Sequence, residues 1–292
     1  MNKILVLTDF SENSVNAYRY AVQLACQVDA NILLVFSSNG EGISLTKQMQ
    51  YSQMMHSFAK RYACDSRQKA NPHHVECLIS GETWPEAIPL LIQVHQPDLV
   101  VAGAGLLTHL QEEAAVISLQ LFEQCPIIWV PEKAHYQPLK NLVFVTDFTD
   151  QDPAVIDLVE RFAKNVKASV TLLHFYARTD RNHLVEIKKR GAELHWLLRD
   201  TEAKYLFIEE EDMIEGLEDY AQHNPVDLFI LATKDSHLTH HYFEPSYLKT
   251  QSCQTAIPLL NLYQEKKKAC TGSCSFCHHD LATDVLQITE GV

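Results

Sequence analysis

The residues with the most evident chemistry lie near the C-terminus, where three cysteines and two histidines follow one another closely. They are Cys270, Cys274, Cys277, His278 and His279. Thiolate and imidazole are the preferred ligands of tetrahedral Zn²⁺, and a Cys-x2-Cys spacing lets one turn of chain supply two of them. We therefore expect a metal site, with zinc as the ion and with Cys270, Cys274, Cys277 and one histidine, assigned to His278, as ligands. Four protein ligands leave no open position, so such a site would be structural.

Two alternatives remain for the same segment. The cysteines can be free thiols on a tail that docks on the rest of the chain, or they can pair in a redox reaction. The spacing Cys-x3-Cys-x-aromatic-Cys also resembles the radical SAM cluster motif, but only residues 278–292 follow, too few for the barrel of that family. A second group, His237, His240 and His241, is expected to be a polar loop, although one of its imidazoles could complete a site with the tail cysteines.

No pattern of residues indicates an enzyme. The sequence has no Gly-x-Ser-x-Gly elbow, no Walker loop, no His-Glu-x-x-His motif and no kinase motif set. Most of the 15 histidines occur singly, and His56, His95, His174 and His195 fall on predicted helices or strands, where a structural or surface role is expected. We therefore expect a protein without catalytic activity.

The elements that must position these residues come in two copies. Residues 3–11 (KILVLTDFS) recur as residues 141–149 (NLVFVTDFT), and residues 30–34 match residues 168–172 at the same spacing. Later matches are looser and pair residues 97–102 with 226–231 and 125–128 with 257–260. Repeats of this kind indicate a duplicated architecture. We predict two homologous domains and a tail, with bounds 1–136, 137–264 and 265–292, and an interdomain linker over residues 131–138.

Within each repeat, short apolar runs alternate with longer amphipathic stretches, which is typical of βαβ units around a parallel sheet buried on both faces. The sequence thus predicts an α/β fold with a five-stranded parallel sheet in each domain. In the second domain, Asp152 and Pro153 are expected to open a helix as N-cap and first residue. The strands predicted in the first domain are residues 3–7, 31–36, 75–79, 99–102 and 127–130.

Length and composition exclude several classes of protein. The 292 residues suffice for about two domains, and a hydrophobic fraction of 46% is ordinary for globular proteins. With 24 basic and 37 acidic residues the formal charge is −13, which argues against a nucleic-acid partner. No apolar stretch reaches the length of about 18 residues needed to span a membrane, and the apolar run after Met1 is too short for a signal peptide. We therefore expect a cytoplasmic protein that has no membrane partner.

Several motifs fall in the same order in both repeats. The first strand ends in Thr-Asp-Phe-Ser/Thr, the fourth is introduced by Pro-Asp-Leu and ends in Gly103, and the last is introduced by Cys125-Pro126. Together they resemble the universal stress protein family in its tandem form, over residues 1–264. The resemblance implies ligand sites at the carboxyl ends of the strands and pairing of the two domains through their last strands. Such pairing would make an intramolecular pseudo-dimer, and a homodimer stays open.

The resemblance also bears on nucleotide binding. Family members that bind ATP carry a Gly-x2-Gly-x9-Gly-Ser/Thr loop after the fourth strand, where glycine lets backbone N–H groups approach the phosphates. Counted from Gly103, the later positions are Leu106, Val116 and Ile117, so only the first position matches. The second repeat has no glycine in residues 231–236. We therefore expect that ATP is not a cofactor.

The candidate ligand contacts of the first repeat are Asp9, Ser11, Gly103 and Gly105. Asp9 and Ser11 match the family position beside the nucleotide, and Gly105 lies one residue from a loop position. The other interpretation gives Asp9 and Ser11 a structural role, in which they cap the turn into the first helix.

These observations predict a non-enzymatic universal stress protein that acts as a binding or regulatory module in the stress response, with an unidentified regulatory protein as partner. One alternative is an ATP-binding switch or weak ATPase that uses the first repeat. The other is a zinc or redox sensor whose tail becomes ordered when it binds metal.

Overall fold

The computed structural model describes residues 1–62, 74–107, 119–146, 152–198, 200–233, 236–243 and 256–264. The predicted metal ligands Cys270, Cys274, Cys277 and His278 lie outside the described residues.

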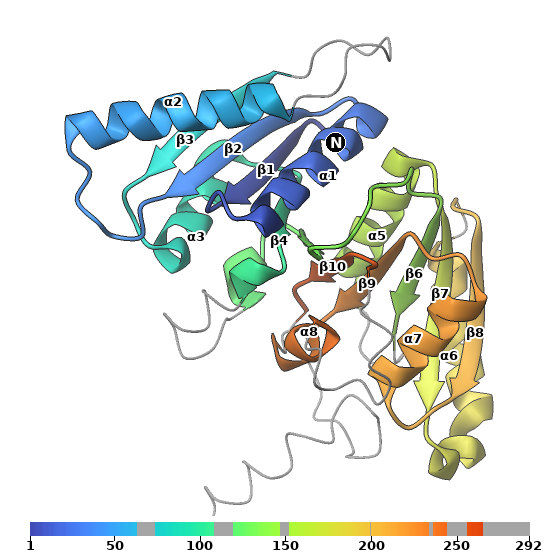
Figure 1. Ribbon diagram of the computed structural model, residues 1–292. Helices are drawn as coiled ribbons and strands as arrows, with labels where there is room; N and C mark the ends of the chain where they lie inside the picture. Colours follow the sequence, from blue (N-terminus) through green and yellow to red (C-terminus); the bar gives the residue numbers. More distant parts are fainter. Residues whose placement is uncertain are drawn as a thin grey trace, which may run out of the picture.

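The described strands form one ten-stranded sheet in the order β3-β2-β1-β4-β5-β10-β9-β6-β7-β8 (Figure 1). Neighbouring strands are parallel except at the centre, where β5 and β10 are antiparallel and Trp129 lies opposite Leu259. The strands of the first half are β1 (Lys3–Thr8), β2 (Asn31–Ser37), β3 (Val75–Ser80), β4 (Leu99–Gly103) and β5 (Ile127–Val130). Those of the second half are β6 (Asn141–Val145), β7 (Ser169–Tyr176), β8 (Ala203–Glu209), β9 (Leu228–Ala232) and β10 (Leu259–Leu262).

The two halves have the same topology. Counted outward from the central pair, the second half has the order β10-β9-β6-β7-β8, which corresponds strand by strand to β5-β4-β1-β2-β3. The first two strands of each half also share a register, because Lys3 lies opposite Asn31 and Asn141 lies opposite Ser169. The predicted α/β fold with five parallel strands in each half is confirmed, as is the pairing of the halves through their last strands.

Helices cover both faces of this sheet, which explains why its inner strands are almost continuously apolar. On one face α1 and α2 cover the first half and α5 and α6 the second, around a shared core; on the other face α3 and η1 cover the first half and α7 and α8 the second. The helices are α1 (Glu12–Val28), α2 (Leu45–Arg61), α3 (Trp84–His95), α5 (Pro153–Val166), α6 (Leu184–Leu197), α7 (Met213–His223) and α8 (Ser236–Phe243), with 3₁₀ turns η1 (Leu119–Phe122) and η2 (Arg178–His183).

Local sequence sets several of these boundaries. The Asp152 carboxylate accepts a hydrogen bond from the Ala154 amide at 2.9 Å, and Pro153 is the first residue of α5, as predicted. The segment predicted as a polar histidine loop is instead the short helix α8. Its buried Tyr242 donates a hydrogen bond to the carbonyl of Ile257 at 2.9 Å, and Thr239 donates to Asn261 at 3.1 Å. These tertiary contacts stabilise a helix that its sequence alone does not indicate.

The aspartate of the Pro-Asp-Leu motif has a structural role. Asp98 precedes β4, and its carboxylate accepts hydrogen bonds from the amides of Asn2 and Lys3 at 2.6 and 3.1 Å. Asp227 precedes β9 and accepts from the amides of Lys140 and Asn141 at 2.9 and 2.8 Å. In both halves this side chain joins the start of the fourth strand to the start of the first.

Residues 131–140 connect the two halves and contain the predicted domain boundary. Ala134 and Leu139 are buried in the core that the halves share, and the Asn16 amide of α1 donates to the carbonyls of Pro131 and Ala134 at 2.9 Å each. The connection is therefore packed against α1, although its composition predicts a polar linker. Within the described part of the chain, we find no helix with the length and apolar character to cross a membrane.

Candidate functional site

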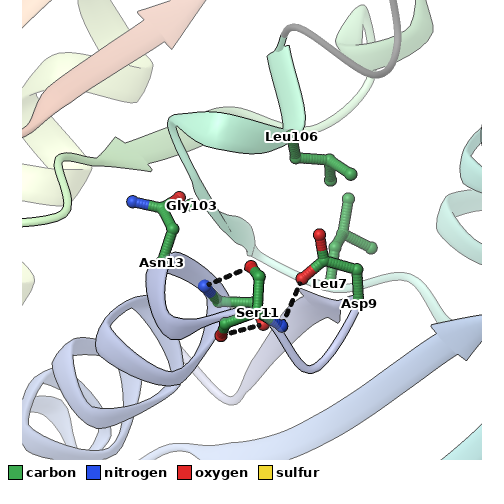
Figure 2. Close-up of a pocket in the computed structure, with 7 residues that line it drawn as sticks. Leu7, Asp9, Ser11, Asn13, Gly103 and Leu106 are labelled. Atoms are coloured by element: carbon green, nitrogen blue, oxygen red, sulfur yellow. Dashed lines mark hydrogen bonds between the residues drawn. The ribbon is translucent and has the colours of Figure 1, made fainter.

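A small hollow lies at the carboxyl ends of β1 and β4, in the first half of the chain (Figure 2). After β1 the chain runs outward to β2 and β3 and then returns to β4 on the other side of β1, so the strand order reverses here. Ligands of open α/β sheets bind at such reversal points. The hollow has about 170 Å³ of empty space, open solvent included, and is lined by Leu7, Asp9, Ser11, Asn13, Ser14, Gly103 and Leu106.

Asp9 is held by the turn that leads from β1 into α1. Its carboxylate accepts a hydrogen bond from the Ser11 amide at 2.9 Å, across Phe10, whose φ of 63° lies in the left-handed region. Burial of the Asp9 carboxyl would raise its pKa, but hydrogen bonds from the hydroxyl and amide of Ser11 and from the Ser14 hydroxyl lower the pKa below its ordinary value. Asp9 therefore presents a stable negative charge to the hollow.

Hydrogen bonds within the turn also satisfy the side chains around Asp9. Ser11 is the N-cap of α1, and its hydroxyl accepts from the Ser14 amide at 3.2 Å. The Ser14 hydroxyl donates to the Ser11 carbonyl at 2.9 Å and accepts from the Thr8 hydroxyl at 3.1 Å. These contacts support the interpretation that Asp9 and Ser11 shape the entry into the first helix.

Asn13 lies in the first turn of α1, and its side chain contacts the segment that follows β4. The amide oxygen of Asn13 accepts a hydrogen bond from the Gly105 amide at 2.9 Å. A Cβ atom at Gly103 would lie 2.0 Å from that oxygen and 3.0 Å from the Asn13 carbonyl, so a larger residue there would require the Asn13 side chain to move. Figure 2 shows the Asn13 side chain beside Gly103. Asn13 could not be predicted as a site residue, because no sequence motif relates this position to the segment after β4.

The four candidate residues thus have different surroundings. Asp9, Ser11 and Gly103 line one hollow, as expected from their places after neighbouring strands, whereas Gly105 is engaged by Asn13. The hollow between the described residues encloses almost no space, far less than the roughly 300–1,000 Å³ of ligand pockets, so it is small for a nucleotide. An anionic Asp9 disfavours phosphate and favours a small polar or cationic group. Val116 and Ile117, the later loop positions, lie outside the described residues.

The corresponding edge of the second half is built differently. Asp147 and Thr149 lie outside the described residues, but the end of β6 is visible at Thr146, whose carbonyl is 2.9 Å from Nδ1 of the buried His174. At the end of β8, Glu209 receives two hydrogen bonds from the Arg181 guanidinium, at 2.6 and 2.8 Å. Glu209 is the first of four consecutive acidic residues, 209–212, and its charge is neutralised by this bidentate ion pair.

Among the described residues, no group of three or more His, Cys, Asp or Glu side chains could hold a metal ion. Three cysteines of this part of the chain, Cys26, Cys77 and Cys125, form no disulfide. Burial raises the pKa of Cys125 to about 12, so this thiol is unsuited to metal binding or redox chemistry.

Comparison with known proteins gives a family for the first half and a fold for the whole chain. The profile of the universal stress protein family matches residues 1–117, whereas no curated protein matches this chain. A universal stress protein from Archaeoglobus fulgidus DSM 4304 is 13% identical, with a TM-score of 0.61 and coverage of 91% of this chain and 98% of its own.

Two further solved structures have the same architecture. A protein assigned to the universal stress proteins from Pseudomonas aeruginosa UCBPP-PA14 is 12% identical, at a TM-score of 0.53 over 90% of this chain and 93% of its own. The cytoplasmic domain of a prokaryotic cation chloride cotransporter is 11% identical, at a TM-score of 0.52 over 89% and 94%. At these identities the likeness is one of fold. Residues 1–117 of the chain thus match the universal stress protein family.

Proposed function

We propose that this chain is a non-enzymatic binding or regulatory module of the stress response and that it does not use ATP. The match of residues 1–117 to the universal stress protein family supports the stress-response role. The observation that carries the second part is the hydrogen bond from the Gly105 amide to Asn13, whose side chain also lies against Gly103. An asparagine of the chain itself thus occupies a backbone donor that a phosphate would need.

The positions of Asn13 and Asp9 make the binding of a nucleotide phosphate at the Gly105 amide energetically unfavourable. A phosphate could reach the Gly105 amide only if the Asn13 side chain rotated away, which would break a 2.9 Å hydrogen bond in the first turn of α1. The incoming anion would then lie in a hollow that already holds the Asp9 carboxylate, and two negative charges at short range repel each other. The loss of the Asn13–Gly105 hydrogen bond and the repulsion by Asp9 both disfavour the binding of ATP phosphates. Neither effect disfavours a neutral or cationic ligand that leaves this hydrogen bond in place.

The test is a thermal melt of the full chain with and without millimolar ATP and Mg²⁺. Because a ligand that binds only the folded state raises the melting temperature, we expect no rise in the parent. Asn13→Ala frees the Gly105 amide and should give any residual nucleotide affinity its best chance. Asn13→Asp, which keeps an acceptor on that amide and adds a charge, is the matched control and should behave like the parent.

The second candidate function is a nucleotide-binding switch in the first half. It is favoured by the fact that Asp9, Ser11 and Gly103 line one hollow at the reversal point of the sheet. If the melting temperature of the parent rises with ATP and Mg²⁺, and Asp9→Ala abolishes the rise, the switch replaces the proposal above.

For the tail we retain the zinc proposal, which rests on the ligand types and spacing of Cys270, Cys274, Cys277 and His278. Untagged full-length protein should contain about one zinc per chain, and Cys274→Ser should lose it. Cys77→Ser, in the half-buried strand β3, is the matched control and should retain the metal. Parent protein without metal would leave the thiols free or redox-active and would contradict the proposal.

A further inference from the structure

Helices α3 and α7 are equivalents in the two halves of the molecule. Each lies on the same face of its half and runs into the fourth strand, β4 or β9. Aligned at one constant spacing, Trp84 matches Met213 and Leu91 matches Tyr220, and all four side chains are buried. The faces of the two helices that pack on the sheet therefore have buried side chains at the same positions.

Their outer faces differ. Leu90 and Val94, one turn apart on α3, are 52% and 64% exposed. The matching residues of α7 are Asp219 and His223, which are exposed and lie 3.6 Å apart. Because the same position in the same fold is polar in the second half, the fold itself does not require an apolar pair there. We call Leu90 and Val94 the α3 stripe. Exposed apolar side chains that the fold does not require are candidates for a contact surface.

The chain leaves its described part at the edge of the sheet where α3 ends. Because β10 is antiparallel to β5, it runs toward the start of β5, and Tyr263 packs against the core under α3 and η1. At that edge the Cys125 thiol donates to the carbonyl of Pro97, in the turn directly after α3, at 3.2 Å. The chain beyond Gln264 therefore starts close to the C-terminal end of α3.

The tail carries a segment suited to this surface. Leu281, Val285 and Ile288 are spaced i, i+4 and i+7, which is the apolar stripe of an amphipathic helix, and Asp280 precedes them as an N-cap residue. From Gln264 to Leu281 an extended chain reaches up to roughly 55 Å. The starts of the neighbouring strands β5 and β4 are only about 5 Å apart. The tail is therefore long enough for Leu281 to reach α3.

We propose that residues 280–290 dock as an amphipathic helix on the α3 stripe of the same chain. Leu281, Val285 and Ile288 would cover Leu90 and Val94, and the contact would remove apolar surface from water on both sides. The cysteine- and histidine-bearing residues 270–279 would then be held at both ends, between Gln264 and α3. The contact is a property of the first half alone, since α7 has the polar pair Asp219 and His223 at the same place.

The experiment is hydrogen–deuterium exchange followed by mass spectrometry on the full chain at low micromolar concentration. We expect the amides of residues 282–290 to exchange at least about 10-fold more slowly than those of an unstructured chain. The double variant Leu90→Asp with Val94→His reproduces the α7 pair, which this fold already accommodates, and should abolish the protection. Leu45→Asp, at an exposed apolar residue of α2, is the matched control and should retain it.

A second variant keeps the test independent of the first. Truncation after residue 279 should speed exchange at the C-terminal half of α3 and leave α7 unchanged. The proposal is overturned if the tail amides are unprotected in the parent, or if they stay protected in the double variant. It is also overturned if sedimentation shows a dimer of the parent that the double variant dissociates while truncation does not, because the stripe would then bind a second copy.

Discussion

Among single residues, Asp9 shows most clearly how the candidate site is held. Burial would raise the pKa of its carboxyl, but hydrogen bonds from Ser11 and Ser14 lower it below 3.8. An acid whose pKa is depressed in the folded state stabilises that state above its unfolded pKa, and loses this contribution as the pH falls through the folded value. We expect an NMR titration of the Asp9 carboxyl carbon to give a midpoint below 3.8, and Ser11→Ala to raise it.

The matched control for this prediction is Ser11→Thr. Threonine keeps a hydroxyl at the N-cap of α1 and should leave the Asp9 midpoint low. An unchanged midpoint in Ser11→Ala would show that the backbone amide of residue 11 alone lowers the pKa. A midpoint above 3.8 in the parent would show that burial outweighs the hydrogen bonds of the turn.

The same residues show how far a sequence predicts a site. Asp9, Ser11 and Gly103 could be grouped because each follows a strand, and the carboxyl ends of neighbouring parallel strands meet at one edge of the sheet. The contact of Asn13 with Gly105 could not be predicted. It depends on the direction in which α1 leaves the turn, which is set by the positive φ of Phe10 and not by any spacing in the sequence.

At the scale of the elements, the two halves differ in how the helix after the third strand packs on the second strand. Gly216 of α7 lies against Phe175 of β7, and a Cβ at Gly216 would lie 2.4 Å from the ring. The matching pair in the first half is Ala87 with Ser37, two small side chains. A bulky strand residue thus accompanies the helix residue that has no side chain.

We predict that Gly216→Ala lowers the free energy of unfolding. Alanine is better than glycine in a helix by about 1 kcal/mol, but overpacking against a buried ring costs typically 1–3 kcal/mol, so a net loss of about 1 kcal/mol is expected. Urea denaturation measures this loss.

Phe175→Leu in the Gly216→Ala background should recover part of the loss, as expected for residues in contact. Gly42→Ala, where a Cβ meets no atom within 4 Å, should be close to neutral. Equal stability of Gly216→Ala and the parent would contradict this account.

Element positions were largely predictable from the sequence. Each of the five strands predicted for the first half lies within one residue of its observed bounds, because strands buried on both faces are apolar runs that polar turns interrupt. The helix α8 was missed, since eight residues carry too little periodicity to predict a helix. Its stability comes from contacts of Thr239 and Tyr242 with residues around β10, which are distant in the sequence.

At the scale of the whole molecule, one side chain joins the two halves. Gln27, near the end of α1, donates through its amide nitrogen to the carbonyls of Val166 and Leu139 at 2.8 and 3.2 Å. Its amide oxygen accepts from the Leu139 amide at 3.1 Å and from the Tyr136 hydroxyl. The first half, the connection and the last residue of α5 therefore share one hydrogen-bonded centre beside the continuous sheet.

Gln27→Ala should therefore weaken the contact between the halves as well as the chain's stability. The substitution leaves two donors and two carbonyls near the centre without their partner, and each part-buried group left unsatisfied costs about 1–3 kcal/mol when water cannot replace the bond. Because water reaches part of this site, we expect a loss of about 2 kcal/mol in urea denaturation. The parent should unfold in a single transition, and Gln27→Ala should show an earlier or broader one.

The control is Gln53→Ala, at an exposed glutamine of α2. It removes the same side chain without these hydrogen bonds and should leave the stability unchanged. If both variants unfold like the parent, the halves are held together by the pairing of β5 with β10 and the apolar core alone.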